Sequence, residues 1–99
     1  MVSQIHLPRE AIVRFCARHH IQRLALFGSV LRDDFGPDSD VDVLVQFEPG
    51  KAPGWEFFRM QDELTELLGR RVDLNTPGFL SPYFRDRVLS GAETVYERA

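Results

Sequence analysis

Residues 27–45 read FGSVLRDDFGPDSDVDVLV, and this stretch decides the predicted fold. The pair Gly28-Ser29 ends one apolar run, and ten residues separate it from Asp40-Val41-Asp42, where a second apolar run begins. Successive side chains of a strand point to opposite faces, so we expect Asp40 and Asp42 to share a face that Val41 does not. The stretch therefore predicts two strands joined by a loop, with two carboxylates beside a glycine turn.

The composition of the chain is that of an ordinary globular protein. Of its 99 residues, 43% are hydrophobic and 27% are charged, which suits a single domain spanning residues 1–99. The formal net charge of −3 gives no global positive field, so we expect no DNA partner. Cys16 is the single cysteine, which excludes an internal disulfide and fits a reducing compartment. No apolar run is long enough to span a membrane, and we therefore expect a cytoplasmic protein with no membrane partner.

Apolar periodicity and turn residues predict helices and strands in alternation along the chain. We expect Gly28, Gly69 and Gly91 to end elements, with loops at residues 35–39 and 49–54. The order of elements and their short connections predict a single α/β or α+β sheet with helices packed against it. The predicted helices are Pro8–His20, a short turn after Ser29, Trp55–Leu68 and Pro82–Ser90, and the predicted strands are Ile21–Phe27, Asp40–Phe47, Arg70–Leu74 and Thr94–Tyr96.

The Gly28-Ser29 turn has the properties of a phosphate site. Backbone N–H groups at the turn and at the start of a following helix would bind an anion, and the Ser29 hydroxyl would add a hydrogen bond. Arg32 lies three residues after Ser29, where it could reach a bound phosphate. It could equally form an ion pair with Asp34 or Asp38, so its role stays open between the two.

The carboxylates offer hard oxygen ligands for a cation. Asp40 and Asp42 suit Mg²⁺, which prefers a few carboxylates together with substrate phosphate oxygens. Two such ions about 3.5–4 Å apart can activate an attacking hydroxyl and stabilise a leaving pyrophosphate. Asp73 interrupts a short apolar run, where an unpaired carboxylate is costly, so it is a candidate third ligand or base. Alternatively, it is an edge residue or an ion-pair partner of Arg70 or Arg71.

The chain resembles the minimal nucleotidyltransferases of the polymerase-β-like superfamily. The resemblance rests on Gly28-Ser29, the ten-residue spacing to Asp40-Val41-Asp42, the position of Arg32, and the later Val72-Asp73-Leu74. It covers nearly the whole chain, including the closing segment 84–97. It implies an α+β fold with a mixed sheet of about three to four strands and flanking helices.

The resemblance also implies a function. Short proteins of this kind are commonly encoded beside a HEPN-domain toxin, and they act as antitoxins by transferring AMP from ATP to a tyrosine of that toxin. For this chain it implies Mg²⁺-dependent nucleotidyl transfer, with two Mg²⁺ ions as cofactors and ATP as the substrate. Asp40 and Asp42 would hold the metal ions, and Asp73 would be a third ligand or the base. Gly28, Ser29 and Arg32 would bind the nucleotide.

A second hypothesis belongs to a different class of function. The aromatic residues Trp55, Phe57 and Phe58 could form a surface that binds a partner toxin and neutralises it by occlusion, without catalysis. Because a domain of this size buries a modest share of its surface, a homo- or hetero-oligomer would also add stability. A third hypothesis, a degenerate nucleotide sensor, predicts ATP binding without turnover.

Overall fold

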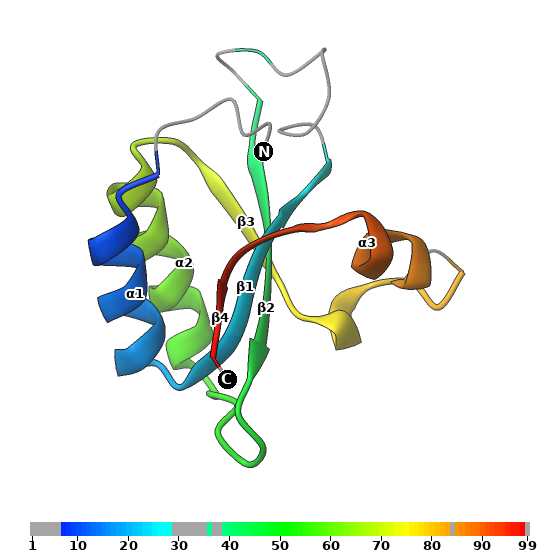
Figure 1. The fold of residues 1–99 in the computed structure, drawn as a ribbon, viewed down its shortest axis with the longest axis horizontal. Helices are drawn as coiled ribbons and strands as arrows, with labels where there is room; N and C mark the ends of the chain where they lie inside the picture. Colours follow the sequence, from blue (N-terminus) through cyan, green and yellow to red (C-terminus); the bar gives the residue numbers. More distant parts are fainter. Residues whose placement is uncertain (1–6, 29–35, 37–38, 84, 99) are drawn as a thin grey trace.

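The computed structural model describes residues 7–28, 36, 39–83 and 85–98 of the chain. Within these residues the strands form one sheet between two groups of helices (Figure 1). The predicted α+β class, with a mixed sheet and flanking helices, is confirmed. The elements are α1 (Arg9–Arg18), β1 (Ile21–Phe27), β2 (Val41–Phe47), α2 (Glu56–Leu68), β3 (Val72–Asn75), the 3₁₀ turn η2 (Pro77–Phe79), α3 (Arg85–Gly91) and β4 (Glu93–Glu97).

The sheet has four strands in the order β3-β2-β1-β4. Strand β1 pairs in antiparallel orientation with both β2 and β4, whereas β2 and β3 are parallel. A parallel pair needs a crossover connection, and α2 provides it between β2 and β3. Strand β4 lies at one edge of the sheet, as the sequence predicts, and β3 forms the other edge.

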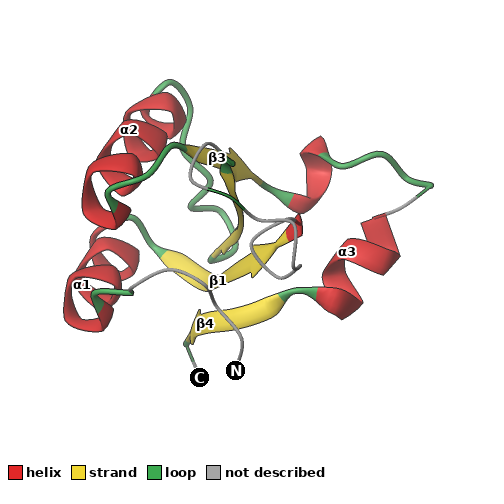
Figure 2. Cartoon of the chain, turned by 90° about the horizontal axis from the view of Figure 1, so that it is seen from above, coloured by secondary structure: helices red, strands yellow, loops and turns green. Residues whose placement is uncertain are grey.

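Helices α1 and α2 cover one face of the sheet and enclose the main core (Figure 2). Alternate residues of β2 point into this layer, so Val41, Val43 and Val45 are completely buried. Each buried aliphatic or aromatic side chain contributes about 1.5–3 kcal/mol to folding. The core consists of Ile12, Phe15, Cys16, Ile21, Leu24, Leu26, Val41, Val43, Val45, Phe57, Met60, Leu64, Val72 and Leu74.

The opposite face of the sheet lies toward η2 and α3 (Figure 1). Its middle is apolar, because Leu44 and its register partner Ala25 on β1 are both buried. Leu80, which follows η2, is also buried. Asp42 lies two residues before Leu44 on β2, so its side chain points to the same face. This face therefore carries a carboxylate at one end.

The element boundaries follow the predictions closely except at α3. Gly69 ends α2 in the left-handed conformation, with φ of +70°, as predicted. The last helix begins three residues later than Pro82 and includes Gly91, so its predicted bounds were wrong. Ser81 nevertheless makes the contacts of the predicted cap: its hydroxyl accepts from the Tyr83 N–H at 3.3 Å, and its carbonyl accepts from the Arg85 N–H at 2.9 Å. Pro82 and Tyr83 form a turn that leads into the helix. None of the helices within the described residues is long and apolar enough to cross a membrane.

Candidate active site

Asp42 and Asp73 lie next to each other on the parallel strands β2 and β3. They are register partners, and neighbouring strands of a sheet are about 4.8 Å apart. Val41 and Val72, which form the preceding register pair, are buried under the helices, so both aspartates point to the opposite face. Asp42 is half-buried and Asp73 is exposed. The fold thus brings together two of the three carboxylates that the sequence singled out.

Gly28 lies directly against the Asp42 carboxylate. It follows β1, whose last residue, Phe27, is the register partner of Asp42. Gly28 has φ of +76°, and a Cβ atom built on it would overlap Oδ2 of Asp42 and lie 3.1 Å from its carboxyl carbon. Both the backbone conformation and the close approach therefore require glycine here. The predicted site residues Ser29 and Arg32 lie outside the described residues.

Asp40 precedes β2 and lies at the same end of the sheet. The fully buried Val41 separates it from Asp42, which fits the predicted alternation of faces. Its Oδ1 atom lies 3.8 Å from Nη1 of Arg71, and both side chains are well exposed. An exposed pair of this kind contributes about 0–1 kcal/mol.

The structure also bears on the alternative interpretation of Asp73, in which it is an edge residue or an ion-pair partner of Arg70 or Arg71. Among the described residues, the Asp73 carboxylate makes no ion pair with either neighbouring arginine. Arg71 faces Asp40, and the Arg70 guanidinium donates to the backbone carbonyls of Gly36 and Ser39. Strand β3 is an edge strand, so Asp73 is an edge residue, as that interpretation predicts. The exposure of Asp73 nevertheless leaves its oxygens accessible on the same face as Asp42.

The donor set at this end of the sheet consists of carboxylate oxygens, which suits Mg²⁺. Within the described part of the chain, no group of three or more acidic, histidine or cysteine side chains is arranged to hold a metal ion. Asp42 and Asp73 provide two donors side by side, with Asp40 near them. Because Mg²⁺ keeps several ligands from water and substrate phosphates, two neighbouring carboxylates are enough to hold it when a nucleotide supplies further oxygens.

A pocket of about 210 Å³ lies beside Gly28, the residue that touches the Asp42 carboxylate. It is lined by Phe27 and Gly28 from the end of β1 and by Arg87, Val88 and Gly91 from α3. The α3 residues lie in the closing segment 84–97 of the resemblance, but sequence reasoning did not assign them to the site, because they reach Gly28 only through the folding of the chain. The one signal in the sequence is their spacing, since residues one turn apart on a helix lie on one face.

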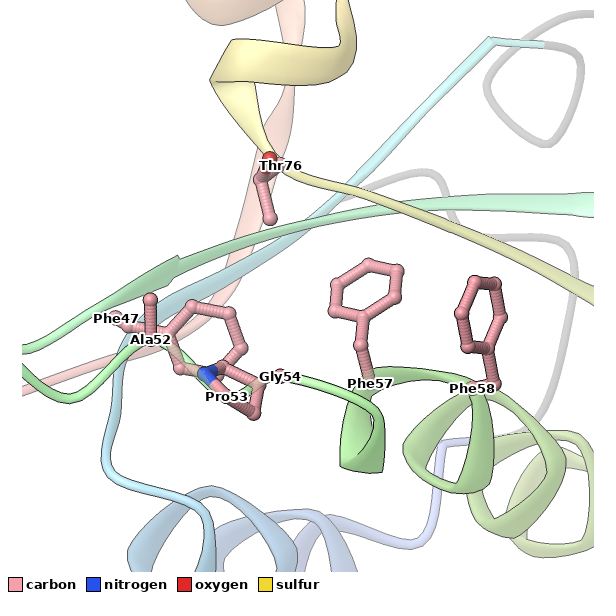
Figure 3. A pocket seen from close by; sticks show the side chains of 7 residues that line it. All are labelled: Phe47, Ala52, Pro53, Gly54, Phe57, Phe58 and Thr76. Carbon is pink, nitrogen blue, oxygen red and sulfur yellow. The ribbon is translucent and has the colours of Figure 1, made fainter.

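A second pocket, of about 220 Å³, lies at the other end of β2 (Figure 3). Its lining is largely apolar and consists of Phe47, Ala52, Pro53, Gly54, Phe57, Phe58 and Thr76. Phe47 is five residues from Asp42 along the strand, which corresponds to about 17 Å. The predicted aromatic cluster is divided: Phe57 is buried, whereas 89% of Trp55 and 64% of Phe58 are exposed.

Two titratable groups in the helix layer, Cys16 and His19, have shifted pKa values. Burial raises the pKa of the Cys16 thiol to about 12. Burial and the neighbouring Arg18 lower the pKa of His19, while Glu56 acts in the opposite direction. His19 Nε2 lies 3.1 Å from Oε1 of Glu63, which also contacts Arg18. These groups tie α1 to α2 and take no part in the candidate site.

Comparison with known proteins identifies the family of the chain. The family model of the nucleotidyltransferase domain matches residues 9–94. The protein MJ0435 of Methanocaldococcus jannaschii, which is named as a protein adenylyltransferase, is 34% identical over 87 residues, or 88% of this chain and 92% of that protein. The protein adenylyltransferase MntA of Thermococcus cleftensis is 41% identical over 80 residues, or 80% of this chain and 77% of that protein. The chain therefore belongs to the nucleotidyltransferase domain family, and its class is that of a nucleotidyltransferase enzyme.

Solved structures share the fold. One described as a minimal nucleotidyltransferase is 43% identical and superposes with a TM-score of 0.70, covering 85% of each chain. A toxin–antitoxin structure with AMP-PNP has a TM-score of 0.73 at 19% identity, covering 93% of this chain and 75% of that one. A complex of a tri-AMPylated Shewanella oneidensis HEPN toxin with an MNT antitoxin has a TM-score of 0.65 at 18% identity, covering 91% and 70%. The predicted resemblance to minimal nucleotidyltransferases is thus confirmed.

Proposed function

We propose that the chain is a Mg²⁺-dependent protein adenylyltransferase that transfers AMP from ATP to a tyrosine hydroxyl of a HEPN-domain toxin and thereby acts as its antitoxin. The observation that carries this proposal is the side-by-side placement of Asp42 and Asp73, with the Gly28 backbone against the Asp42 carboxylate. The relatives named as protein adenylyltransferases and the structural neighbours that contain HEPN toxins support the choice of acceptor.

In the proposed reaction, the acceptor oxygen attacks the α-phosphorus of ATP. The bond between the α-phosphorus and the oxygen that bridges to the β-phosphate breaks, pyrophosphate leaves, and the hydroxyl proton is lost. Asp73 is the group best placed to take that proton, because its exposed carboxylate can be reached by a side chain of another protein. Gly28 and Ser29 would bind the triphosphate, and Arg32 would assist.

Asp40, Asp42 and Asp73 would hold the Mg²⁺ ions. Bound there, Mg²⁺ neutralises charge that develops on the phosphate oxygens during transfer. The protein positions the groups that would surround the phosphates. The parallel pairing of β2 and β3 holds two carboxylates on one face, and the contact with Asp42 keeps Gly28, the first residue of the predicted phosphate-binding turn, beside them. ATP and a reduced Cys16 are both typical of the cytoplasm, so a cytoplasmic location is part of the proposal.

The proposal is tested with the purified chain, the HEPN protein encoded beside it, ATP and Mg²⁺. We expect the intact mass of the partner to increase by whole AMP units, and tryptic peptides to carry AMP on tyrosine. Asp42→Asn should abolish the increase, whereas Asp62→Asn, which changes an exposed aspartate on α2 away from the site, should leave it intact. An unmodified partner, or equal modification by the Asp42→Asn variant, would contradict the proposal.

The second candidate function is neutralisation by occlusion, and the exposed side chains of Trp55 and Phe58 favour it. Phe58 lines an apolar pocket at the end of β2 remote from the carboxylates, and Trp55 follows Gly54, which also lines it, so a partner could bind there without entering the active site. If this function is correct, Asp42→Asn with Asp73→Asn should still neutralise the toxin in cells, and Trp55→Ser with Phe58→Ser should not. The adenylyltransferase proposal expects the carboxylate variant to fail.

A further inference from the structure

We propose that α3 forms one wall of the nucleotide site and that Arg87 binds the phosphate chain of the nucleotide. The inference rests on the proposed function, because it assumes that a nucleoside triphosphate occupies the Gly28 end of the sheet. It adds a binding residue from a part of the chain that lies far in sequence from the Gly28-Ser29 turn and from the three aspartates.

The position of the pocket is the first observation that supports this assignment. Its walls are Phe27 and Gly28 on one side and Arg87, Val88 and Gly91 on the other. Gly28 also touches the Asp42 carboxylate, so this one residue borders both the pocket and that carboxylate. A volume of about 210 Å³ is smaller than the roughly 300–1,000 Å³ of a site that encloses a whole small molecule. The pocket therefore suits one part of a nucleotide, with the remainder lying over the carboxylates.

The charge of the residues that line the pocket is the second observation. Arg87 is the one ionisable side chain among the residues that line this pocket. The carboxylates beside it repel a triphosphate, and a guanidinium offsets that repulsion while it donates two hydrogen bonds to phosphate oxygens. Within the described residues, the Arg87 guanidinium has no hydrogen bond or ion pair with another side chain. It is exposed and can therefore turn toward a ligand.

The neighbouring Arg85, in contrast, has a structural role. Its Nη2 atom donates to the backbone carbonyl of Leu80 at 3.1 Å, and its Nε atom is buried. Arg85 thus holds the segment before α3 in place, whereas Arg87, two residues later, points to a different side of the helix. Arg87, Val88 and Gly91 lie within one helical turn and together form the face that meets Gly28.

The first experiment measures nucleotide binding to the full chain by isothermal titration calorimetry in the presence of Mg²⁺. We expect Arg87→Gln to weaken ATP binding by about tenfold or more, since a hydrogen-bonded charge pair is lost, and to leave adenosine binding unchanged. The matched control is Arg59→Gln, which changes an exposed arginine on α2. Arg87→Lys should restore part of the ATP affinity. In the transfer assay KM for ATP should rise with little change in kcat.

Two results would overturn the inference, and they are distinguishable. If the wild-type chain binds ATP and modifies its partner but Arg87→Gln behaves like Arg59→Gln, the role of Arg87 is wrong and the proposed function stands. If the wild-type chain binds no ATP, the proposed function fails and the inference fails with it.

Gly91 gives a second test that does not depend on charge. A Cβ atom built there meets no atom within 4 Å, so a larger side chain fits the fold and extends toward the pocket. Gly91→Leu should keep the thermal transition of the wild type and weaken ATP binding. Gly54→Leu is the matched control, because its Cβ also meets nothing and it lines the other pocket. Unchanged ATP affinity in Gly91→Leu would contradict the proposed position of the nucleotide.

Discussion

Gly28 and Asp42 are in such close contact that no side chain larger than hydrogen fits between them. This contact joins the end of β1 to the start of β2 at the place where the sequence motif predicts a phosphate-binding turn beside a carboxylate. It fixes the Gly28 backbone relative to the Asp42 oxygens. The spacing of ten residues between the two parts of the motif is thus bridged by one direct contact.

Gly28→Ala should therefore be more damaging than an ordinary glycine substitution. The left-handed backbone costs a non-glycine residue about 1–2 kcal/mol, and displacement of the Asp42 carboxylate adds to this cost. We expect the free energy of unfolding, measured by urea denaturation, to fall by about 2–4 kcal/mol.

Gly50 provides the matched control for this experiment. It has the same φ of +76°, but a Cβ atom there meets nothing within 4 Å. Gly50→Ala should show the backbone cost alone, so it should lose less stability than Gly28→Ala. Equal losses in the two variants would show that the contact with Asp42 contributes nothing. Adding Asp42→Ala to Gly28→Ala should recover part of the difference.

The pairing of Asp42 with Asp73 predicts a response of stability to Mg²⁺. Two carboxylates side by side repel each other, and a bound cation removes that repulsion. With Mg²⁺ and a non-hydrolysable ATP analogue, the wild type should melt at a higher temperature and Asp42→Asn should not. A rise in melting temperature of the same size in both proteins, followed by differential scanning fluorimetry, would contradict the assignment of Asp42 as a ligand.

Cys16 should be inert in the folded protein. Its side chain is completely buried, and its thiol has a pKa of about 12, so almost no thiolate is present at pH 8. We expect reaction with Ellman's reagent to be slow in buffer and rapid in guanidinium chloride. The rate in buffer should follow the fraction of unfolded protein as the denaturant concentration rises. Rapid labelling of the native chain would show that the packing of α1 on the sheet is different from that described.

His19 should make stability depend on pH. Its pKa in the folded state is lowered by burial and by Arg18, so the unfolded state binds the proton more tightly. The stability that this group contributes is fully present above the unfolded pKa of about 6.5, and it is lost as the pH falls toward the lower folded value. The melting temperature should therefore decrease through this range.

Two variants separate His19 from the other titrating groups. His19→Gln should reduce the dependence of the melting temperature on pH between 7 and 5.5, because the proton can no longer bind. His20→Asn, which changes the exposed neighbour with φ of +58°, should retain the dependence of the wild type. Identical pH profiles for the wild type and His19→Gln would show that another group is responsible.

Much of the fold could be predicted from the sequence where local signals agree with burial. Strand β1 has the predicted bounds, because a continuous apolar run ends at a glycine. Helix α2 ends at Gly69 for the reason expected of a left-handed cap. At α3 the predicted cap is present, since the hydroxyl and carbonyl of Ser81 accept from the N–H groups of Tyr83 and Arg85, but the bounds of the helix are Arg85–Gly91.

The candidate site could be predicted in part. The glycine turn and Asp42 are linked by adjacent antiparallel strands, which the sequence motif already indicates. The register that sets Asp73 beside Asp42 depends on the crossover through α2, and no local pattern specifies it. Arg87 reaches Gly28 through the turn at η2 and the packing of α3, so it could be found only in the folded chain.

The proposal predicts that the chain, with Asp42 and Asp73 at its active site, transfers the AMP part of ATP to a protein. The most direct measurement compares ATP labelled at the α-phosphate with ATP labelled at the γ-phosphate, each incubated with the chain, Mg²⁺ and the HEPN-domain toxin proposed as its partner. We predict that the partner acquires the α-label and not the γ-label, and that Asp42→Asn or Asp73→Asn abolishes the transfer. Transfer of the γ-label, or α-label transfer that both variants retain, would contradict the account.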